Sequence, residues 1–406
     1  MRLLLLLLGV GLSFSVFAQC ENERYREFQF AEVTTTIGVE YGNNLTYQGA
    51  AQVLTMDVYQ PTGDAQVDRP LVMIAHGGFF VGGSSDGTDV VPMCTDLAKM
   101  GYVVASINYR LGWPLASDLS GPMTAAVMRG TQDMKAAIRW FRKNAAENGN
   151  TFNIDPNQIY LGGVSAGGYI ALHHAYLDQE AEIPSFLNWS DPGISGGIEG
   201  ESGNAGYSSQ VNAIFSVAGA IGDTAWIQAD DEPCLLFHGT NDNTVPFGSD
   251  MQYAFGVVAV TEVDGSNSIN EKMDEIGLEH CFEIYEGQDH VPHVSNIAYY
   301  DTTLSIITNF LSHHICDIEL DCEYRLLAVN TDELSQPIQR VFPNPAELWI
   351  TLPDHVSTVT LTSIQGQRTV KRAEGNRLFV GDIARGIYLI TWSENGTLHS
   401  EKIILN

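Results

Sequence analysis

The stretch IYLGGVSAGGY, residues 159–169, ends an apolar run by surrounding Ser165 with four glycines. Glycine loses more backbone entropy on folding than any other residue, so four glycines this close together require a structural reason. One interpretation is a tight strand-to-helix turn in which the serine is incidental. The other is a nucleophile elbow, in which Gly163 and Gly167 permit a strained turn that exposes the Ser165 hydroxyl. Because G-x-S-x-G also occurs by chance, the surrounding sequence has to decide between them.

Short apolar runs rich in β-branched residues alternate with helical patterns from about residue 50 to 315. Six of these runs predict buried parallel strands, at residues 69–78, 101–110, 157–165, 210–219, 233–239 and 280–287. Helical patterns lie between them, notably at residues 125–149 and directly after Ser165. This alternation predicts the α/β class with a mostly parallel, doubly wound sheet. Residues 185–209, rich in Gly, Ser and Asn, predict an insertion that covers the sheet.

The pattern changes after Cys322. From residue 341 onward, short alternating strands and turns predict a small all-β sandwich at residues 341–406. Residues 323–340 are then the expected linker. The larger α/β domain, which we expect to be the catalytic one, takes residues 19–322.

The first residues, MRLLLLLLGVGLSFSVFA, combine Arg2, an apolar stretch and small residues around the end. This pattern is typical of a secretory signal peptide, here residues 1–18, cut after Ala18. Cys20 permits a lipoprotein as the second interpretation, although Gln19 fits poorly before a lipid-modified cysteine. No later stretch is apolar enough to predict a membrane span, so we expect an exported protein without stable membrane insertion.

The charge balance is strongly acidic. Lys and Arg together number 20 and Asp and Glu 49, so the formal net charge is −29. Such a surface repels phosphate groups, and we therefore expect no nucleic-acid partner.

Export permits disulfides among the six cysteines, which are Cys20, Cys94, Cys234, Cys281, Cys316 and Cys322. Two pairings are open from the sequence. Cys316 and Cys322 are close enough to close a short loop, and Cys234 could pair with Cys281 if their strands are neighbours. No cysteine spacing matches a metal-ligand motif such as C-x-x-C, and no metal site is predicted.

Chemistry-bearing residues follow the predicted strands. A serine hydroxyl needs a general base and an acid that orients the base, and in open α/β sheets such groups lie beyond the carboxyl ends of strands. Asp242 follows one strand in HGTND, residues 238–242, and His290 follows the next in EGQDH, residues 286–290. The order Ser165, Asp242, His290 is that of an α/β-hydrolase triad. The nucleophile elbow is therefore the favoured interpretation.

Upstream, the loop HGGFF at residues 76–80 follows the strand that ends at Ala75. Its glycines expose backbone N–H groups, so Gly77 and Gly78 are the expected oxyanion donors, together with Ala166 beside the nucleophile. Aromatic residues are candidates for binding substrate; we select Phe79, Phe80 and Trp189, with Trp113 and Tyr169 as further candidates.

Other side chains compete for the roles of base and acid. His293 is an alternative base, and Asp289 flanks His290. The alternative acids do not follow a strand in an H-G-x-x-D turn; they are Asp223, Asp231 and Asp250. His238 is expected to be structural, as are the histidine pairs at 173–174 and 313–314 and an ion pair between Arg110 and Asp133.

Four motifs together resemble the carboxylesterase branch of the α/β-hydrolase superfamily over residues 50–315. They are HGGFFVGG, SINYRLGW, IDPNQIYLGGVSAGG and HGTNDNTVP. Phe79 replaces the third glycine of the family's H-G-G-G motif, and Val164 stands where many relatives have an acidic residue. The resemblance implies an α/β-hydrolase fold and a Ser–His–Asp ester hydrolase that needs no cofactor.

The C-terminal motifs FPNPA, IQGQ, GIYL and EKIILN are similar to the sorting domain of the type IX secretion system of Gram-negative bacteria. This resemblance covers residues 341–406. It implies the secretion machinery as a partner, transit through the periplasm, and release or attachment at the cell surface. A carbohydrate-binding β-sandwich is the alternative.

We therefore expect a secreted serine ester hydrolase, acting on small or polymeric esters such as feruloyl or acetyl polysaccharide esters or polyesters. A prolyl-oligopeptidase-type serine peptidase is the alternative enzyme, because it shares the order of the triad. A binding protein on a hydrolase scaffold is the non-enzymatic alternative.

Overall fold

A computed structural model describes residues 17–114, 116–254, 256–325, 346, 348–352, 356, 358–363, 368–394 and 397–405. The chain divides into two compact units, with the boundary between residues 326 and 327. The expected signal peptide lies outside the described residues, except for its last two positions. Most of the expected linker also lies outside them.

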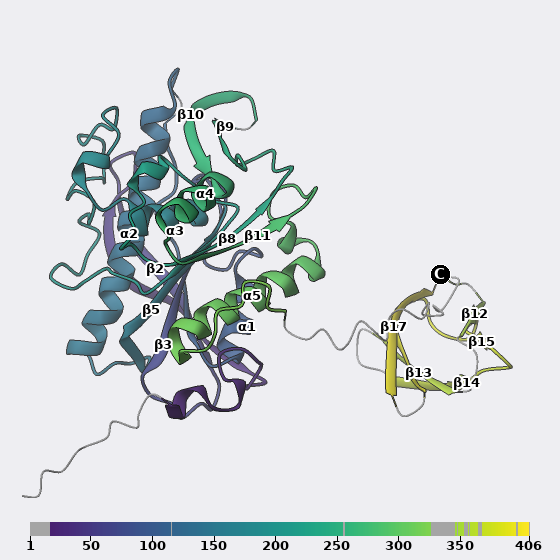
Figure 1. Ribbon diagram of the computed structural model, residues 1–406. Helices are drawn as coiled ribbons and strands as arrows, with labels where there is room; N and C mark the ends of the chain where they lie inside the picture. The colour runs from purple at the N-terminus through teal and green to yellow at the C-terminus, as the bar shows by residue number, and fades with distance from the viewer. Residues whose placement is uncertain are drawn as a thin grey trace, which may run out of the picture. The chain divides into compact units, whose positions relative to one another are not determined.

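An eight-stranded sheet forms the centre of the larger unit (Figure 1). Its order is β1-β2-β4-β3-β5-β6-β8-β11, in which β2 runs antiparallel to both neighbours and the other pairings are parallel. The strands are β1 Val33–Leu45, β2 Ala51–Pro61, β3 Arg69–Ala75, β4 Val103–Ile107, β5 Ile154–Val164, β6 Ile214–Val217, β8 Cys234–Gly239 and β11 His280–Tyr285. The six predicted parallel strands are confirmed. This is the expected α/β-hydrolase fold.

Helices cover both faces of this sheet (Figure 1). They are α1 Val91–Lys99, α2 Ser120–Glu147, α3 Ala166–Tyr176, α4 Ser266–Ile276 and α5 Ile297–Cys316. Alternate residues of β3 divide between two cores: Leu71 and Met73 pack on the side of α2 and α3, while Val72 and Ile74 pack on the side of α1 and α5. Because both faces are buried there, β3, β4, β6 and β8 are buried along their whole length, as is typical of parallel strands between two helical layers.

A second, three-stranded sheet lies outside this pattern and was not predicted. Its order is β7-β10-β9, with β7 Ala220–Ile221, β9 Ser249–Ala254 and β10 Val258–Gly265. The hairpin of β9 and β10 lies between β8 and α4 in the sequence. Its strands are short and partly exposed, so they do not have the continuous apolar run of the main sheet.

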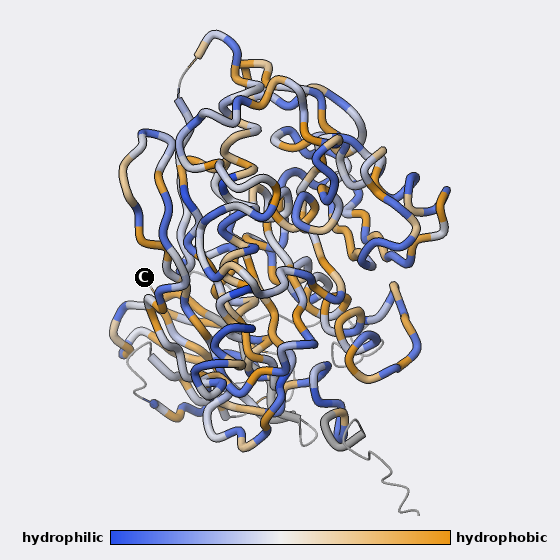
Figure 2. The backbone as a smooth tube through the Cα atoms, turned by 90° about the vertical axis from the view of Figure 1, so that its left-hand side faces the viewer, coloured by the Kyte–Doolittle hydropathy of each residue, from blue (hydrophilic) through white to orange (hydrophobic). Residues whose placement is uncertain are grey.

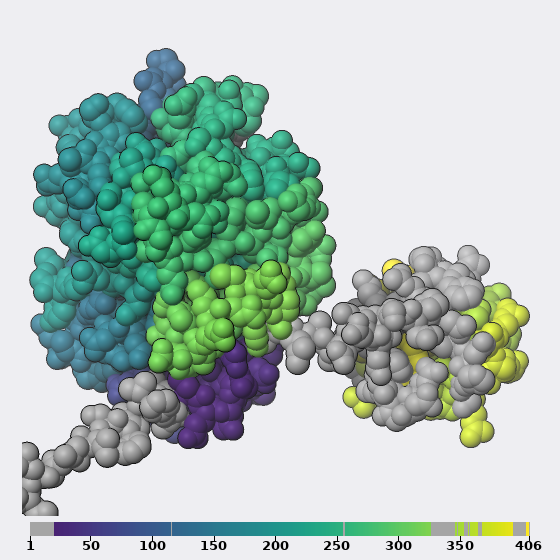
Figure 3. Space-filling model, viewed as in Figure 1, coloured from purple at the N-terminus to yellow at the C-terminus, as the bar shows by residue number. Residues whose placement is uncertain are grey.

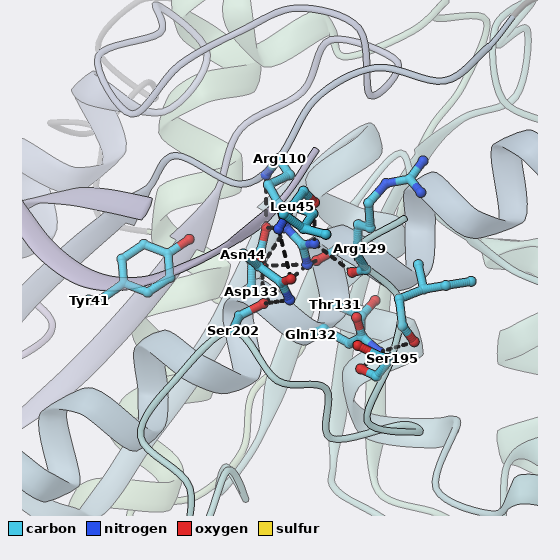
Figure 4. Close-up of polar contacts among 12 residues, drawn as sticks. Tyr41, Asn44, Leu45, Arg110, Arg129, Thr131, Gln132, Asp133, Ser195 and Ser202 are labelled. Carbon is cyan, nitrogen blue, oxygen red and sulfur yellow. Dashed lines mark hydrogen bonds and ion pairs between the residues drawn. The ribbon is translucent and has the colours of Figure 1, made fainter. Parts of the chain in front are cut away.

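The segment at residues 185–209 differs from the expected insertion over the sheet. It packs beside α2, and Ile194 and Ser202 within it are fully buried. The guanidinium of Arg110 pairs with Asp133 at 2.8 Å, donates to the carbonyl of Gly193, and reaches the Ser202 hydroxyl at 3.1 Å (Figure 4). A buried charge has to be paired and hydrogen-bonded, so this network holds the segment against the domain.

The disulfides differ from both open pairings. Cys20 bonds to Cys316, and Cys281 to Cys322, while Cys94 and Cys234 are free and buried. The strands of Cys234 and Cys281 are indeed neighbours, but Cys281 is in register with Leu235. Side chains alternate between the faces of a sheet, so the thiols of residues 234 and 281 point to opposite faces. The first disulfide holds the N-terminal segment against α5, where the two surfaces meet in Figure 3.

The smaller unit is all β within the described residues, as predicted. One sheet pairs β12 Trp349–Thr351 with β15 Arg377–Phe379. The other has the antiparallel order β14-β13-β16-β17, with strands Arg368–Arg372, Thr358–Ser363, Gly386–Glu394 and Thr397–Leu405. The core of this unit includes Leu361, Ile390 and Ile403.

Hydrophobic and hydrophilic residues alternate in short stretches along the tube of Figure 2. Among the helices that the structure describes, none combines the length and the apolar character needed to cross a membrane.

Candidate active site

Ser165 lies at the turn between β5 and α3, in a conformation that L residues rarely adopt. Its φ is 55° and its ψ −114°. The glycines explain how the turn is possible: a Cβ on Gly163 would lie 2.1 Å from the carbonyl oxygen of Gly167, and a Cβ on Gly167 would lie 1.9 Å from that of Ala75. Both positions therefore require glycine. A strained serine on a strand-to-helix turn is the geometry of a nucleophile elbow.

Loops after β8 and β11 bring two further side chains to this turn. His290 Nε2 lies 2.9 Å from Ser165 Oγ, and His290 Nδ1 lies 2.7 Å from Asp242 Oδ2. Both distances are within hydrogen-bond range. The three predicted triad residues, separated by up to 125 positions in the sequence, therefore form one hydrogen-bonded chain.

The carboxyl group of Asp242 is held in one orientation. Its Oδ1 accepts hydrogen bonds from the amides of Thr244 and Val245 at 2.8 and 2.9 Å, which leaves Oδ2 facing His290. Burial alone would raise the pKa of this carboxyl, but hydrogen bonds from His238 and His290 outweigh burial and lower the pKa below its usual value. Asp242 is therefore ionised at neutral pH, as the acceptor of an imidazole proton has to be.

The loop at residues 76–80 lies beside the serine, but it differs in one respect from the expected oxyanion hole. The Gly77 amide donates to Asp89 Oδ2 at 2.7 Å, so this expected donor is already engaged. Within the described residues, the amides of Gly78 and Ala166 donate no hydrogen bond. Two of the three predicted donors are thus available, while the third ties the loop to Asp89.

A cavity of about 270 Å³ opens beside Ser165. Its walls are largely apolar and aromatic, and include Met123, Val127, Met128, Tyr169, Phe186, Trp226 and Val260. The ionisable groups among its described lining are the carboxyls of Glu182, Asp223 and Glu262, together with His173, whose pKa is lowered to about 4 by burial, and Tyr169, whose pKa is raised by burial. The cavity suits an uncharged, apolar group bound next to the serine.

Two of the three predicted substrate-binding residues line this cavity. Phe79 and Phe80 do so, and both have positive φ, 56° and 57°. Trp189 is outside the described lining; Phe186, three residues earlier, lines the cavity instead, although 48% of it is exposed. No local pattern indicates this exchange, because the segment has no helix or strand that determines which aromatic residue lines the cavity.

The competing histidines do not take the place of His290 between Ser165 and Asp242. His293 is buried, neither of its ring nitrogens has a hydrogen-bond partner in the described structure, and burial together with the charge of His290 lowers its pKa to about 4. His238 bonds to Ser266 Oγ at 2.8 Å and lies 3.3 Å from Asp242 Oδ2. His238 thus lies against the carboxyl of Asp242 and supports it. The sequence predicted only that His238 is a structural residue.

Comparisons with known proteins agree with both resemblances. Residues 56–223 match the BD-FAE family model, which includes the loop at residues 76–80 and Ser165 but ends before Asp242. Residues 340–406 match the model described as Secretion system C-terminal sorting domain. The expected similarity to carboxylesterases and to a type IX sorting domain is thereby confirmed.

Among curated proteins, the bile salt-activated lipase of Homo sapiens is 34% identical over 127 residues, which are 30% of this chain and 16% of that protein. Carboxylesterase 3B of Mus musculus is 38% identical over 120 residues, 29% of this chain and 19% of that protein. The chain thus spans under a fifth of the length of these two relatives. A thermophilic esterase from Thermogutta terrifontis with propionate bound aligns over 71% of this chain and 95% of its own, with 23% identity and a TM-score of 0.48.

Proposed function

We propose that the chain is a secreted serine hydrolase of carboxylic esters that works by Ser–His–Asp acyl transfer. The observation that supports this best is the continuous hydrogen-bonded chain from Ser165 through His290 to Asp242. The matches to a lipase and a carboxylesterase support the same reaction class.

In the first step, His290 Nε2 takes the proton of the Ser165 hydroxyl as its oxygen attacks the ester carbonyl. Asp242 keeps the proton of the imidazole on Nδ1, so that Nε2 can accept, and stabilises the imidazolium that forms. The imidazolium then gives its proton to the departing alcohol. The products are the free alcohol and an acyl-serine.

The oxyanion formed in this step needs N–H donors that are not already engaged. Gly78 and Ala166 fill this role in the proposal. The Gly77 amide, which donates to Asp89, instead fixes the loop that presents Gly78. In the second step, His290 activates a water molecule, which attacks the acyl-serine and releases the acid.

The cavity beside Ser165 narrows the substrate class. Its apolar and aromatic walls favour an acyl or aromatic group without charge, and its three carboxyl groups disfavour an anionic one. Feruloyl or acetyl esters of polysaccharides, and polyesters, have uncharged groups of this kind. With the C-terminal domain as a sorting signal, the enzyme would cross the periplasm and act outside the cell or at its surface.

The test is hydrolysis of p-nitrophenyl acetate, butyrate and octanoate by the wild type, by Ser165→Ala and by the control Ser195→Ala. Ser195 is outside the described cavity lining, and its hydroxyl bonds to Glu201. We expect only Ser165→Ala to lose turnover and labelling by a fluorophosphonate. Near-wild-type activity of Ser165→Ala would overturn the mechanism, and anilides cleaved as fast as esters would favour a peptidase.

A further inference from the structure

A second cluster of chemistry-bearing side chains lies at the opposite edge of the sheet from Ser165. Glu279 directly precedes β11, whose other end leads to His290. His313 and His314 are in the last turn of α5. One oxygen of Glu279 and one ring nitrogen of each histidine all lie within 4.8 Å of one another.

The spacing of these atoms is wrong for hydrogen bonds but suitable for metal ligands. His313 Nε2 is 3.5 Å from Glu279 Oε2, and His314 Nε2 is 3.6 Å from Glu279 Oε1. Hydrogen bonds between nitrogen and oxygen are typically about 2.7–3.2 Å long. In a tetrahedral zinc site with bonds of about 2.0–2.1 Å, neighbouring ligand atoms are roughly 3.3 Å apart.

The orientation of the His313 ring also favours a cation. Its Nδ1 is hydrogen-bonded to the carbonyl of Ile318. A carbonyl only accepts, so Nδ1 carries a hydrogen, and Nε2 is the ring nitrogen that faces Glu279. A ring N–H donated to a backbone carbonyl is also the usual support of a metal-bound histidine.

His314 provides an independent observation. Its Nε2 is buried and has no hydrogen-bond partner in the described structure, although it faces the cluster. The cluster is nevertheless reachable, because the side chains of Glu279 and His313 are 44% and 23% exposed.

We propose that Glu279, His313 and His314 bind one divalent transition-metal ion, with Zn²⁺ the best fit and water as the fourth ligand. Two imidazoles and a carboxylate are ligands that zinc accepts, whereas Mg²⁺ prefers oxygen ligands only. The C-terminal end of α5 adds a partial negative charge that attracts a cation.

The role of this ion would be structural. It would join the end of α5 to the start of β11, beside the disulfides of Cys316 and Cys281. It lies at the amino edge of the sheet, so it does not take part in the proposed ester hydrolysis.

The test uses full-length, untagged protein treated with a chelator and dialysed. Calorimetric titration with ZnCl₂ should give one site, and the melting temperature should rise with Zn²⁺ but not with MgCl₂. Glu279→Gln and His313→Gln should each weaken zinc binding at least tenfold. The control Asp274→Asn removes a carboxylate that lies 3.6 Å from another histidine, His280, and should change binding less than twofold.

Two results would overturn the proposal. One is the absence of a zinc site in the wild type; the other is unchanged zinc affinity in both Glu279→Gln and His313→Gln. Equal loss in Asp274→Asn would move the site to His280 and would likewise exclude the cluster. The experiment does not measure ester hydrolysis, so its outcome is independent of the proposed function.

Discussion

The substitution Asp242→Asn tests the proposed role of the acid, because the structure determines the orientation of the asparagine side-chain amide. Two backbone amides, those of Thr244 and Val245, donate to Oδ1 at 2.8 and 2.9 Å. The carbonyl oxygen of asparagine has to take this position, since its NH₂ group cannot accept. The NH₂ group then takes the place of Oδ2, 2.7 Å from His290 Nδ1.

An N–H donor at that place forces His290 into the other tautomer. Nδ1 would accept from the asparagine, and the hydrogen would move to Nε2, which then cannot take the proton of Ser165. In a Ser–His–Asp triad of another protein, the corresponding change lowers the rate about 10⁴-fold. We expect a loss of the same order here, which corresponds to about 5 kcal/mol of transition-state stabilisation.

The assay is kcat/KM for p-nitrophenyl butyrate, measured together with the melting temperature. The matched control is Asp289→Asn, in the same loop as His290. The Asp289 carboxyl accepts from the backbone amides of Asn243 and His290 and makes no described bond to the imidazole ring, so we expect less than a tenfold loss. A loss below tenfold in a folded Asp242→Asn variant would refute the reasoning and move the acid to another residue.

Two further predictions concern the oxyanion loop and the response to acid. Asp89→Ala removes the acceptor of the Gly77 amide, so kcat should fall about tenfold to a hundredfold with little change in KM, whereas Asp86→Ala in the same loop should not lower it. Equal kcat in the two variants would contradict this role of Asp89. Stability should fall as the pH decreases from 6.5 to 4, because the unfolded chain takes up protons on histidines that burial keeps neutral in the folded state; these are His173, His174 and His293. The decrease in the free energy of unfolding, measured with urea at several pH values, should reach at most about 1.4 kcal/mol per pH unit for each histidine, and a flat profile would refute it.

The six parallel strands of the central sheet were predictable because most of them are buried on both faces and stand out as apolar runs. β1 and β2 were not predicted, and most of β1 is exposed. That Asp242 and His290 lie close to Ser165 was predictable for a related reason: each follows such a run, so the strand order brings them to one edge of the sheet. Residues whose position depends on loops were not predictable. Contacts between distant segments decide whether Phe186 or Trp189 lines the cavity. They also decide which acceptor the Gly77 amide finds.

The cysteines also show which features follow from the strand order and which do not. That Cys234 and Cys281 lie on neighbouring strands follows from the strand order, but the register of the pairing places them on opposite faces. A shift of one residue reverses the face to which a side chain points, and nothing in the local sequence specifies that shift. The bond between Cys20 and Cys316 joins residues separated by 296 positions, which no local pattern indicates.

That bond makes residues 20–316 a single covalent ring. The ring contains Ser165, Asp242 and His290, so one proteolytic cut in any loop between its cysteines leaves the two pieces linked. The bond between Cys281 and Cys322 attaches the next residues to the same ring. A cut between residues 322 and 327 would therefore detach the C-terminal unit and leave every bonded cysteine, and the three residues of the proposed triad, in the part that remains.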